Sequence, residues 1–288
     1  MTVVLPTIPA ARQWVQAGRS AGKTIGLVPT MGAFHEGHRS LFRRARERCG
    51  LVVASVFVNP LQFGPGEDYA RYPRDFARDL AIAEQERLDA VFHPEAQEMY
   101  PQPPETTADP GKLGERLCGA SRPGHFAGVA TVVAKLLNIV QPDCVFFGQK
   151  DAQQSVIVRK MVLDLNFPVE IEICPTLREP DGLAMSSRNV YLSPEKRAQA
   201  AILYRSLRHA ESLIRSGVRD AARVEQEMQE MIRAVPGAVI EYARVVDRNT
   251  LEEVRQMDGE VLVAVAVRMG RTRLIDNLLV APPSEPRP

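Results

Sequence analysis

Residues 24 to 41 of this 288-residue chain read TIGLVPTMGAFHEGHRSL. The apolar run over residues 24–28 favours a β-strand, Pro29 and Gly32 punctuate a turn, and an amphipathic helix follows with Leu41 on its apolar side. A strand that enters a helix through glycines brings backbone N–H groups and the positive end of the helix dipole together, as in many phosphate sites. The stretch therefore predicts a strand–loop–helix unit with an anion site at its turn.

Two histidines stand in this turn. His35 and His38 are three residues apart, so both could reach one phosphate chain from the turn and the first helical turn. A plain surface loop and a fortuitous metal pair are the alternatives. A zinc protease needs its histidines four apart on a regular helix, whereas Gly37 interrupts this pair, and no Cys-x-x-Cys or second histidine cluster supplies a third ligand. The pattern favours phosphate over metal.

The composition is that of an ordinary protein with a substantial core. Lys plus Arg is 36 and Asp plus Glu is 35, so no basic field of the kind that binds nucleic acid is present, and 45% of the residues are hydrophobic. We expect no leader, because the N-terminus lacks a basic n-region and a sustained apolar segment, and no apolar run reaches membrane length. The four widely spaced cysteines suit a reducing cytoplasm, where we expect the protein to reside. They are Cys49, Cys118, Cys144 and Cys174.

Apolar runs alternate with amphipathic stretches over the first two thirds of the chain. Strands are expected at 24–28, 51–58, 89–93, 143–147 and 169–174, with helices at 8–21, 73–87, 128–140 and 151–163. This alternation predicts an α/β fold with a doubly wound, parallel, five-stranded Rossmann-like sheet. The Pro- and Gly-rich residues 94–124 are expected to form a long irregular segment, such as a lid or a subunit contact.

The last third has a different texture. Helices at 194–216 and 220–235 precede strands at 239–246, 261–268 and 273–279, which is an α+β pattern. We therefore expect a nucleotide-binding domain over residues 1–183 and a smaller α+β lid domain over 184–288, with a frayed tail from Pro282. The loop 178–190 is the predicted hinge.

Polar residues follow several predicted strands. In a parallel sheet the loops after these strands emerge at one edge, so six side chains are expected to converge. They are His35, His38, Asn59, Gln62, Lys150 and Arg188. Taken singly, each could be an ordinary loop residue; together they are phosphate and alcohol ligands. No nucleophile elbow or reactive cysteine accompanies them, so catalysis would rest on orientation and on charge stabilisation.

Four stretches carry the most specific signal, namely PTMGAFHEGH (29–38), FVNPLQF (57–63), FGQKD (147–151) and MSSRN (185–189). Together they resemble the pantoate-beta-alanine ligase family of the HIGH-type nucleotidyltransferase superfamily. The first is similar to the His-x-Gly-His signature and the last to a degenerate Lys-Met-Ser-Lys-Ser loop. The resemblance implies a reaction with ATP and Mg²⁺ in two steps: pantoate forms an enzyme-bound pantoyl adenylate with release of pyrophosphate, and β-alanine then gives pantothenate and AMP.

The resemblance also implies residue roles and a homodimer. His38 would be the proton donor, supported in catalysis by His35, Lys150 and Arg188. ATP would contact Pro29, Thr30, Met31, Gly32, Ala33, Phe34, His35, Glu36, Gly37, His38, Gly148, Gln149, Lys150, Asp151, Leu177, Met185, Ser186, Ser187 and Arg188. Pantoate would be held by Gln62, Gln154 and Asn59, with Gln62 also meeting β-alanine. Magnesium would sit mainly on phosphate oxygens, so no protein metal cage is expected.

These roles are chemically reasonable. A tight guanidinium clamp would blunt a carboxylate nucleophile, whereas neutral amides such as Gln62 and Gln154 orient it without quenching it. Two departures from the family pattern stand out, Gln149 at a position often acidic and Leu177 where valine is familiar. Another adenylyl or cytidylyl transferase of the superfamily, or a nucleotide-binding regulator without chemistry, are the alternatives.

Overall fold

The computed structural model describes residues 1–283, so the last residues of the predicted frayed tail lie outside the described part of the chain. The chain forms two compact units. The N-terminal unit contains residues 1–115, 122–149 and 157–175; the C-terminal unit contains residues 116–121 and 150–156 and the chain from 176 onward. The sequence-based domain limits, 1–183 and 184–288, stay a prediction.

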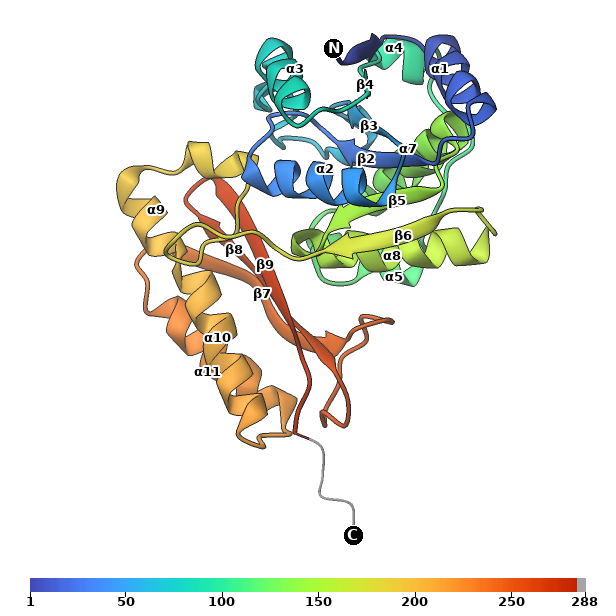
Figure 1. Ribbon diagram of the computed structural model, residues 1–288. Helices are drawn as coiled ribbons and strands as arrows, with labels where there is room; N and C mark the ends of the chain where they lie inside the picture. The colour runs from blue at the N-terminus through green and yellow to red at the C-terminus, as the bar shows by residue number, and fades with distance from the viewer. Residues whose placement is uncertain (284–288) are drawn as a thin grey trace. The chain divides into compact units, whose positions relative to one another are not determined.

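The N-terminal unit is built on a parallel sheet of six strands in the order β1-β4-β3-β2-β5-β6 (Figure 1). They are β1 (Val3–Leu5), β2 (Ile25–Thr30), β3 (Leu51–Val56), β4 (Ala90–Phe92), β5 (Cys144–Gly148) and β6 (Glu170–Cys174). The predicted α/β class and doubly wound topology are confirmed, but the predicted number of five strands is wrong. Strand β1 was missed because it is short and exposes Val3 and Val4 at the sheet edge.

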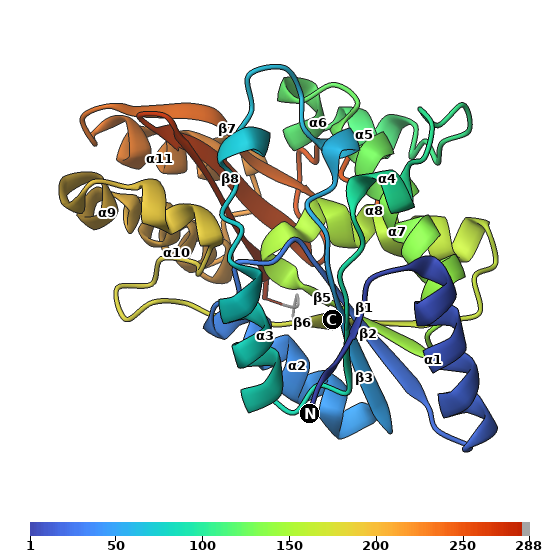
Figure 2. The ribbon, with the colours of Figure 1, turned by 90° about the horizontal axis from the view of Figure 1, so that it is seen from above.

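Helices cover both faces of this sheet. The helices of this unit are α1 (Ile8–Ser20), α2 (Glu36–Arg48), α3 (Phe76–Gln85), α4 (Ala96–Met99), α5 (Lys112–Glu115), α7 (His125–Val140) and the part of α8 (Ala152–Asp164) from Ile157 onward. The short helix α6 (Cys118–Ser121) and the first turn of α8 belong to the C-terminal unit. Helices α2 and α3 lie on one side of the sheet, and α1 and α7 lie on the other (Figure 2). The face under α2 and α3 is a core in which Phe42 and Ala83 pack on Val28 and Phe146.

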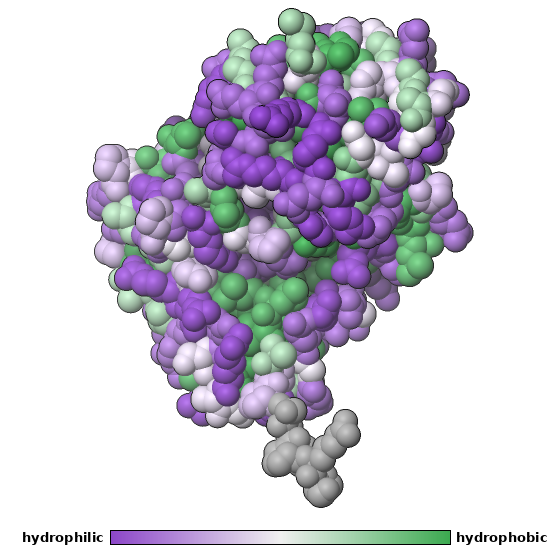
Figure 3. Space-filling view, viewed as in Figure 1, coloured by the Kyte–Doolittle hydropathy of each residue, from purple (hydrophilic) through white to green (hydrophobic). Residues whose placement is uncertain are grey.

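The outer face of α2 is an ion-pair network. Its five arginines are Arg39, Arg43, Arg44, Arg46 and Arg48, and each contacts a carboxylate of a neighbouring element or of the helix itself. Figure 3 shows the resulting hydrophilic surface over α2. Because carboxylates already neutralise these arginines, this face reads as a solvated surface, and each such exposed pair contributes about 0–1 kcal/mol.

The C-terminal unit is an antiparallel sheet covered by helices. Strands β7 (Ala238–Asp247), β8 (Val261–Met269) and β9 (Thr272–Val280) pair in that order, and the helices are α9 (Pro194–Ala200), α10 (Ile202–Arg215) and α11 (Ala221–Arg233). The apolar stripes of α10 and α11 bury Leu207 and Met228 against Val263 and Val265. This confirms the α+β texture, although one predicted helix is the pair α9 and α10.

Two short segments complete the C-terminal unit. In the first, the Sγ of Cys118 lies 3.1 Å from the hydroxyl of Tyr242, and Ser121 donates to Glu241. In the second, the carbonyl of Lys150 accepts a hydrogen bond of 2.9 Å from Asn277 on β9. Part of the segment predicted as irregular, 94–124, is therefore tied to the sheet of this unit.

Candidate active site

The ends of β2 and β5 mark the topological switch point of the parallel sheet. These strands are neighbours, and the chain winds from β2 to β3 and β4 on one side and from β5 to β6 on the other. Ligands of open α/β sheets bind outside the carboxyl ends of the strands at such a point. The loops that leave it here are Met31–His35 and Gly148–Gln149, which places two of the predicted stretches at the switch point.

A buried carboxylate shapes the turn after β2. Asp79 on α3 is 2% exposed and accepts hydrogen bonds from the backbone N–H groups of Ala33, at 2.8 Å, and Phe34, at 2.7 Å. Gly32 adopts φ +83°, and a Cβ there would lie 2.8 Å from Oδ2 of Asp79, so only glycine fits. Burial raises the pKa of Asp79, and the two backbone N–H groups oppose that rise.

Backbone N–H groups of the turn fix the tautomer of both histidines. His35 is the N-cap of α2, and its Nδ1 accepts from the backbone N–H of Gly37 at 3.1 Å. The Nδ1 of His38 accepts from the backbone N–H of His35 at 3.3 Å, and the ring centroids are 4.2 Å apart. Because both Nδ1 atoms accept, the proton of each neutral ring is on Nε2. Both imidazoles are therefore Nε2–H donors.

The backbone of this turn differs from the expected phosphate nest. Gly32 donates to the hydroxyl of Thr30, Ala33 and Phe34 donate to Asp79, and His35 and Gly37 donate to the imidazoles. These backbone N–H groups already have partners within the protein. Anion binding at this turn stays a prediction, and it would depend on the side chains and on the dipole of α2 rather than on these backbone groups.

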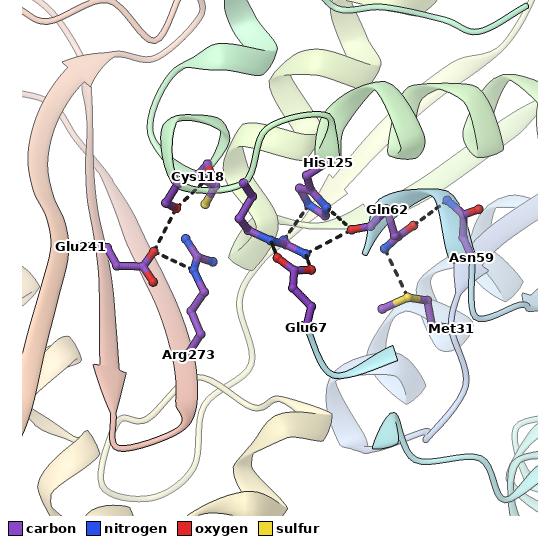
Figure 4. A network of polar contacts seen from close by, with 10 residues as sticks. Met31, Asn59, Gln62, Glu67, Cys118, His125, Glu241 and Arg273 are labelled. Carbon is purple, nitrogen blue, oxygen red and sulfur yellow. Dashed lines mark hydrogen bonds and ion pairs between the residues drawn. The ribbon is translucent and has the colours of Figure 1, made fainter. Parts of the chain in front are cut away.

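The loop after β3 brings an amide to the same turn (Figure 4). In the short helix η1 (Pro60–Gln62), the Nε2 of Gln62 lies 3.2 Å from the Sδ of Met31, and its Oε1 accepts from Asn59 at 3.0 Å. Thioether sulfur is a weak acceptor, so this N–H can exchange it for a carboxylate or hydroxyl at little cost. The structure thus brings Gln62 into contact with Met31, a residue that the loop argument did not include.

Asn59 is 1% exposed, and its amide makes four contacts inside the protein. Its Oδ1 accepts from the hydroxyl of Tyr100 at 2.9 Å and from the N–H of Leu61, while its Nδ2 donates to Gln62 and to the carbonyl of Gly128. These contacts use its full hydrogen-bonding capacity. Asn59 therefore fixes the amide of Gln62, and its direct contact with a substrate stays a prediction.

The other predicted residues belong to the C-terminal unit. The Nζ of Lys150 lies 3.7 Å from the carboxylate of Asp151 in the turn that follows β5, and its side chain is 20% exposed. Gln154 is half-buried on the first turn of α8. Its neighbour Gln153 is buried and bonds the backbone of Cys118 and Arg116, which fixes that turn. The ammonium of Lys150 and the amide of Gln154 thus extend from backbone that is fixed by hydrogen bonds.

Residues 177–185 form a closed hairpin within the C-terminal unit. The backbone N–H of Met185 donates to the carbonyl of Leu177 at 3.0 Å, which joins two predicted ATP contacts. Arg178 makes a two-point ion pair with Asp276 on β9, at 2.6 and 3.0 Å, and stacks over Tyr204. Burial raises the pKa of Asp276, and Arg178 opposes that rise.

The serine and arginine of the MSSR stretch follow this hairpin. Ser186 caps the short helix η4 (Ser187–Tyr191) by accepting from the backbone N–H of Arg188 at 3.2 Å. Helix η4 contacts β9, the strand that also holds the carbonyl of Lys150. The main chain of Lys150 and the helix that contains Arg188 therefore both contact β9. The predicted hinge 178–190 is held inside this unit, and the convergence of its cations with the histidines stays a prediction.

Sequence reasoning missed three supporting residues. Asp79 supports the histidine turn, Tyr100 supports Asn59, and Asp276 supports the hairpin. Only Asp79 left a usable signal, because it occupies the apolar face of α3 between Phe76 and Ala83, where a carboxylate needs a partner. The other two depend on contacts between residues far apart in the sequence.

Within residues 1–283, no group of three or more His, Cys, Asp and Glu side chains could hold a metal ion. No helix in that range has the length and apolar character needed to cross a bilayer. All four cysteines are free and buried, and burial raises the pKa of Cys174 to about 11, which makes it a poor nucleophile at neutral pH.

Comparisons with known proteins agree on one family. The family model described as pantoate-beta-alanine ligase matches residues 3–279. A pantothenate synthetase of Syntrophomonas wolfei is 54% identical over 96% of this chain and 99% of its own length. The crystal structure of pantothenate synthetase from Thermus thermophilus is similar with a TM-score of 0.92 and 46% identity, covering 98% of this chain and all of that one.

A further solved structure contains ligands. It is a pantoate-beta-alanine ligase from Francisella tularensis complexed with beta-gamma ATP and beta-alanine. This chain matches it with a TM-score of 0.79 and 32% identity, covering 97% of this chain and 98% of that one.

Proposed function

This chain belongs to the pantoate-beta-alanine ligase family, and we propose that the site described above activates pantoate as an adenylate. The chain is an ATP-dependent ligase that forms the C–N bond between pantoate and β-alanine. One observation carries the proposed mechanism: two imidazole Nε2–H donors and an amide held on a weak acceptor lie on the loops that follow the neighbouring strands β2 and β3.

In the first step, the carboxylate of pantoate attacks the α-phosphorus of ATP, and the bond to the leaving pyrophosphate breaks. Gln62 exchanges the sulfur of Met31 for pantoate and orients it, while Asn59 keeps the amide in place. Because an amide is uncharged, the carboxylate keeps its nucleophilicity. Gln154 is the second pantoate amide, which the family resemblance implies.

The imidazoles serve the phosphate side of the same step. The Nε2–H of His38, with that of His35 beside it, donates to the phosphate oxygens as negative charge builds on them. A preorganised donor of this kind lowers a barrier by about 3–4 kcal/mol. Asp79 contributes by holding the turn, so the rings need no rearrangement when the substrate arrives.

The cations of the C-terminal unit serve the leaving group. Lys150 and Arg188, with the hydroxyls of Ser186 and Ser187, neutralise the departing pyrophosphate. Leu177 and Met185, joined by their backbone hydrogen bond, form one wall for the adenine. Because the hairpin is fixed to β9 through Arg178, movement of this unit would carry the whole cationic set with it. This is the proposed lid role of the C-terminal domain.

In the second step, the amine of β-alanine attacks the carbonyl carbon of pantoyl adenylate, and AMP leaves as the amide forms. Gln62 remains in place for both steps and meets β-alanine as well. No protein group becomes acylated, which agrees with the burial and raised pKa of Cys174.

ATP enters as its magnesium complex, in which the ion sits on phosphate oxygens and shields their charge. The carboxylate of Asp151 is 49% exposed beside Lys150. In this proposal it accepts a hydrogen bond from a water ligand of such an ion. We also propose a homodimer, as the family resemblance implies; sedimentation equilibrium would then report twice the chain mass, and a single chain mass would refute it.

Pyrophosphate exchange tests the proposal. With magnesium, we expect labelled pyrophosphate to enter ATP only when pantoate is present. His38→Ala should slow this exchange by about 10²–10⁴-fold while the Kd for ATP changes far less. His209→Ala is the matched control, because His209 lies on α10 and pairs with Glu227. Exchange without pantoate, or formation of ADP, would refute the proposal; equal losses of turnover and ATP binding would make His38 a binding residue.

A further inference from the structure

We propose that Arg122 and His125 are positioning residues that fix the main chain of Gln62 and thereby aim its amide at pantoate. The inference rests on the proposed function, in which Gln62 holds pantoate. Neither residue has a role in the mechanism above. Arg122 precedes α7 and His125 is its first residue, and both belong to the same unit as Gln62. Figure 4 shows His125 beside Gln62.

Two side chains donate to the carbonyl oxygen of Gln62. The Nδ1 of His125 lies 2.7 Å from it, and the Nη2 of Arg122 lies 3.2 Å from it. A carbonyl can only accept, so the Nδ1 of His125 carries a proton. The Nη1 of Arg122 lies 2.9 Å from the Nε2 of His125, and a guanidinium can only donate, so Nε2 accepts. His125 is therefore the neutral Nδ1–H tautomer.

Glu67 fixes the guanidinium in this arrangement. Its carboxylate accepts from the Nε and Nη2 of Arg122 at 2.7 and 2.6 Å, a two-point contact that sets the plane of the guanidinium. The side chain of Arg122 is 12% exposed, so the contact is largely shielded from solvent. Glu67 and Gln62 belong to the same loop. Arg122, which precedes α7, and His125, which begins it, therefore hold this loop at two points.

Close packing keeps the loop against α7. A Cβ on Gly128, one turn into the helix, would lie 2.2 Å from the carbonyl oxygen of Leu61. The backbone of η1 therefore rests directly on the helix backbone at a position that only glycine allows. The hydrogen bond from Asn59 to the carbonyl of Gly128 adds a further attachment at 3.1 Å. The main chain of Gln62 thus has partners on several sides.

The side chain of Gln62 is held less firmly than its main chain. Its Nε2 donates only to the sulfur of Met31 in the contacts described above, which is a weak acceptor. When pantoate replaces that sulfur, the direction of the amide depends on Asn59 and on the peptide from which the side chain extends. The clamp made by Arg122 and His125 holds that peptide, so its loss should weaken pantoate binding and leave ATP binding unchanged.

Three variants of His125 test the role. Asparagine can keep a donor near the Nδ1 position, whereas glutamine moves its donor toward the Nε2 position. We expect His125→Ala to raise KM for pantoate about tenfold or more, the loss of one hydrogen bond of about 1.4 kcal/mol, with KM for ATP within about twofold of wild type. His125→Asn should restore most of the loss and His125→Gln little. Should His125→Ala fail to fold, the Asn and Gln pair still decides the matter.

A double-mutant cycle with Gln62→Ala tests separately whether Gln62 holds pantoate and whether His125 positions Gln62. If His125 acts through Gln62, His125→Ala should add little to the pantoate KM of Gln62→Ala. Additive effects, a loss shared equally by pantoate and ATP, or equal behaviour of the Asn and Gln variants would overturn the positioning role alone. An unchanged pantoate KM in Gln62→Ala would instead overturn the proposed role of Gln62, and this inference with it.

Discussion

The histidine turn depends on one buried carboxylate, and Asp79→Asn isolates its contribution. The substitution preserves size and shape but keeps one acceptor oxygen and replaces the other by an NH₂ group. Wild-type Asp79 accepts from Ala33 at 2.8 Å and from Phe34 at 2.7 Å, inside a site with 2% exposure. In the variant one backbone N–H faces a second donor and loses its partner.

The expected loss of stability follows from the hydrogen bonds that the substitution removes. A hydrogen bond to a charged acceptor contributes about 1.5–3 kcal/mol, and a buried donor without a partner costs about 1–3 kcal/mol. We therefore expect Asp79→Asn to lose about 2–3 kcal/mol of unfolding free energy. The turn should also relax away from Gly32, which packs on the same carboxylate. Because misplacement of a reacting group by about 1 Å can cost about 10²-fold in rate, kcat should fall by roughly that factor.

Urea unfolding and steady-state kinetics measure the two effects. Asp164→Asn is the control, since this aspartate is 49% exposed on α8 and pairs with Lys160 in a surface contact. We expect the control to stay within about 0.5 kcal/mol of wild type. If Asp79→Asn matches the control in both stability and kcat, the carboxylate does not hold the turn, and the explanation for the placement of the imidazoles fails.

Two further substitutions test neighbouring parts of the structure. Arg178→Gln leaves the buried Asp276 carboxylate without its cation and should cost about 3–5 kcal/mol in urea unfolding; a loss below about 1 kcal/mol would show that the hairpin is not anchored there. Glu67→Gln tests pH dependence: the hydrogen bonds and charge of Arg122 outweigh burial and lower the pKa of Glu67 below 4.5. The wild type should therefore have a larger unfolding free energy than this variant above about pH 4.5, and this difference should vanish as the pH falls through the lower folded pKa. A difference in unfolding free energy that grows on acidification would contradict the assignment.

Much of the fold follows from the sequence because burial leaves a clear pattern. Strands β2, β3 and β5 are continuous apolar runs, and the apolar stripe of α11 has helical spacing, so these elements were predicted close to their observed bounds. Strand β1 was missed because Val3 and Val4 are exposed and resemble any short terminal segment. Strand β1 forms by pairing with β4, and no local sequence pattern identifies that partner.

Individual residues of the site could be predicted from the sequence, but the contacts that position their side chains could not. The turn with His35 and His38 was found from spacing, and its place at the switch point follows from the parallel topology. The contacts that position the side chains join residues far apart in sequence, such as Asp79 with the turn and His125 with Gln62. The backbone N–H groups of the turn were expected to bind phosphate. Two of them instead donate to Asp79, a residue distant in the sequence.

The central claim is that the carboxylate of pantoate attacks the α-phosphorus of ATP. The direct measurement is to run a full turnover with pantoate labelled with ¹⁸O in its carboxylate and to determine the label by mass spectrometry. Our account predicts one ¹⁸O atom in AMP for each pantothenate formed, and none in pyrophosphate. Label in inorganic phosphate with ADP as the coproduct, or AMP without label, would contradict it.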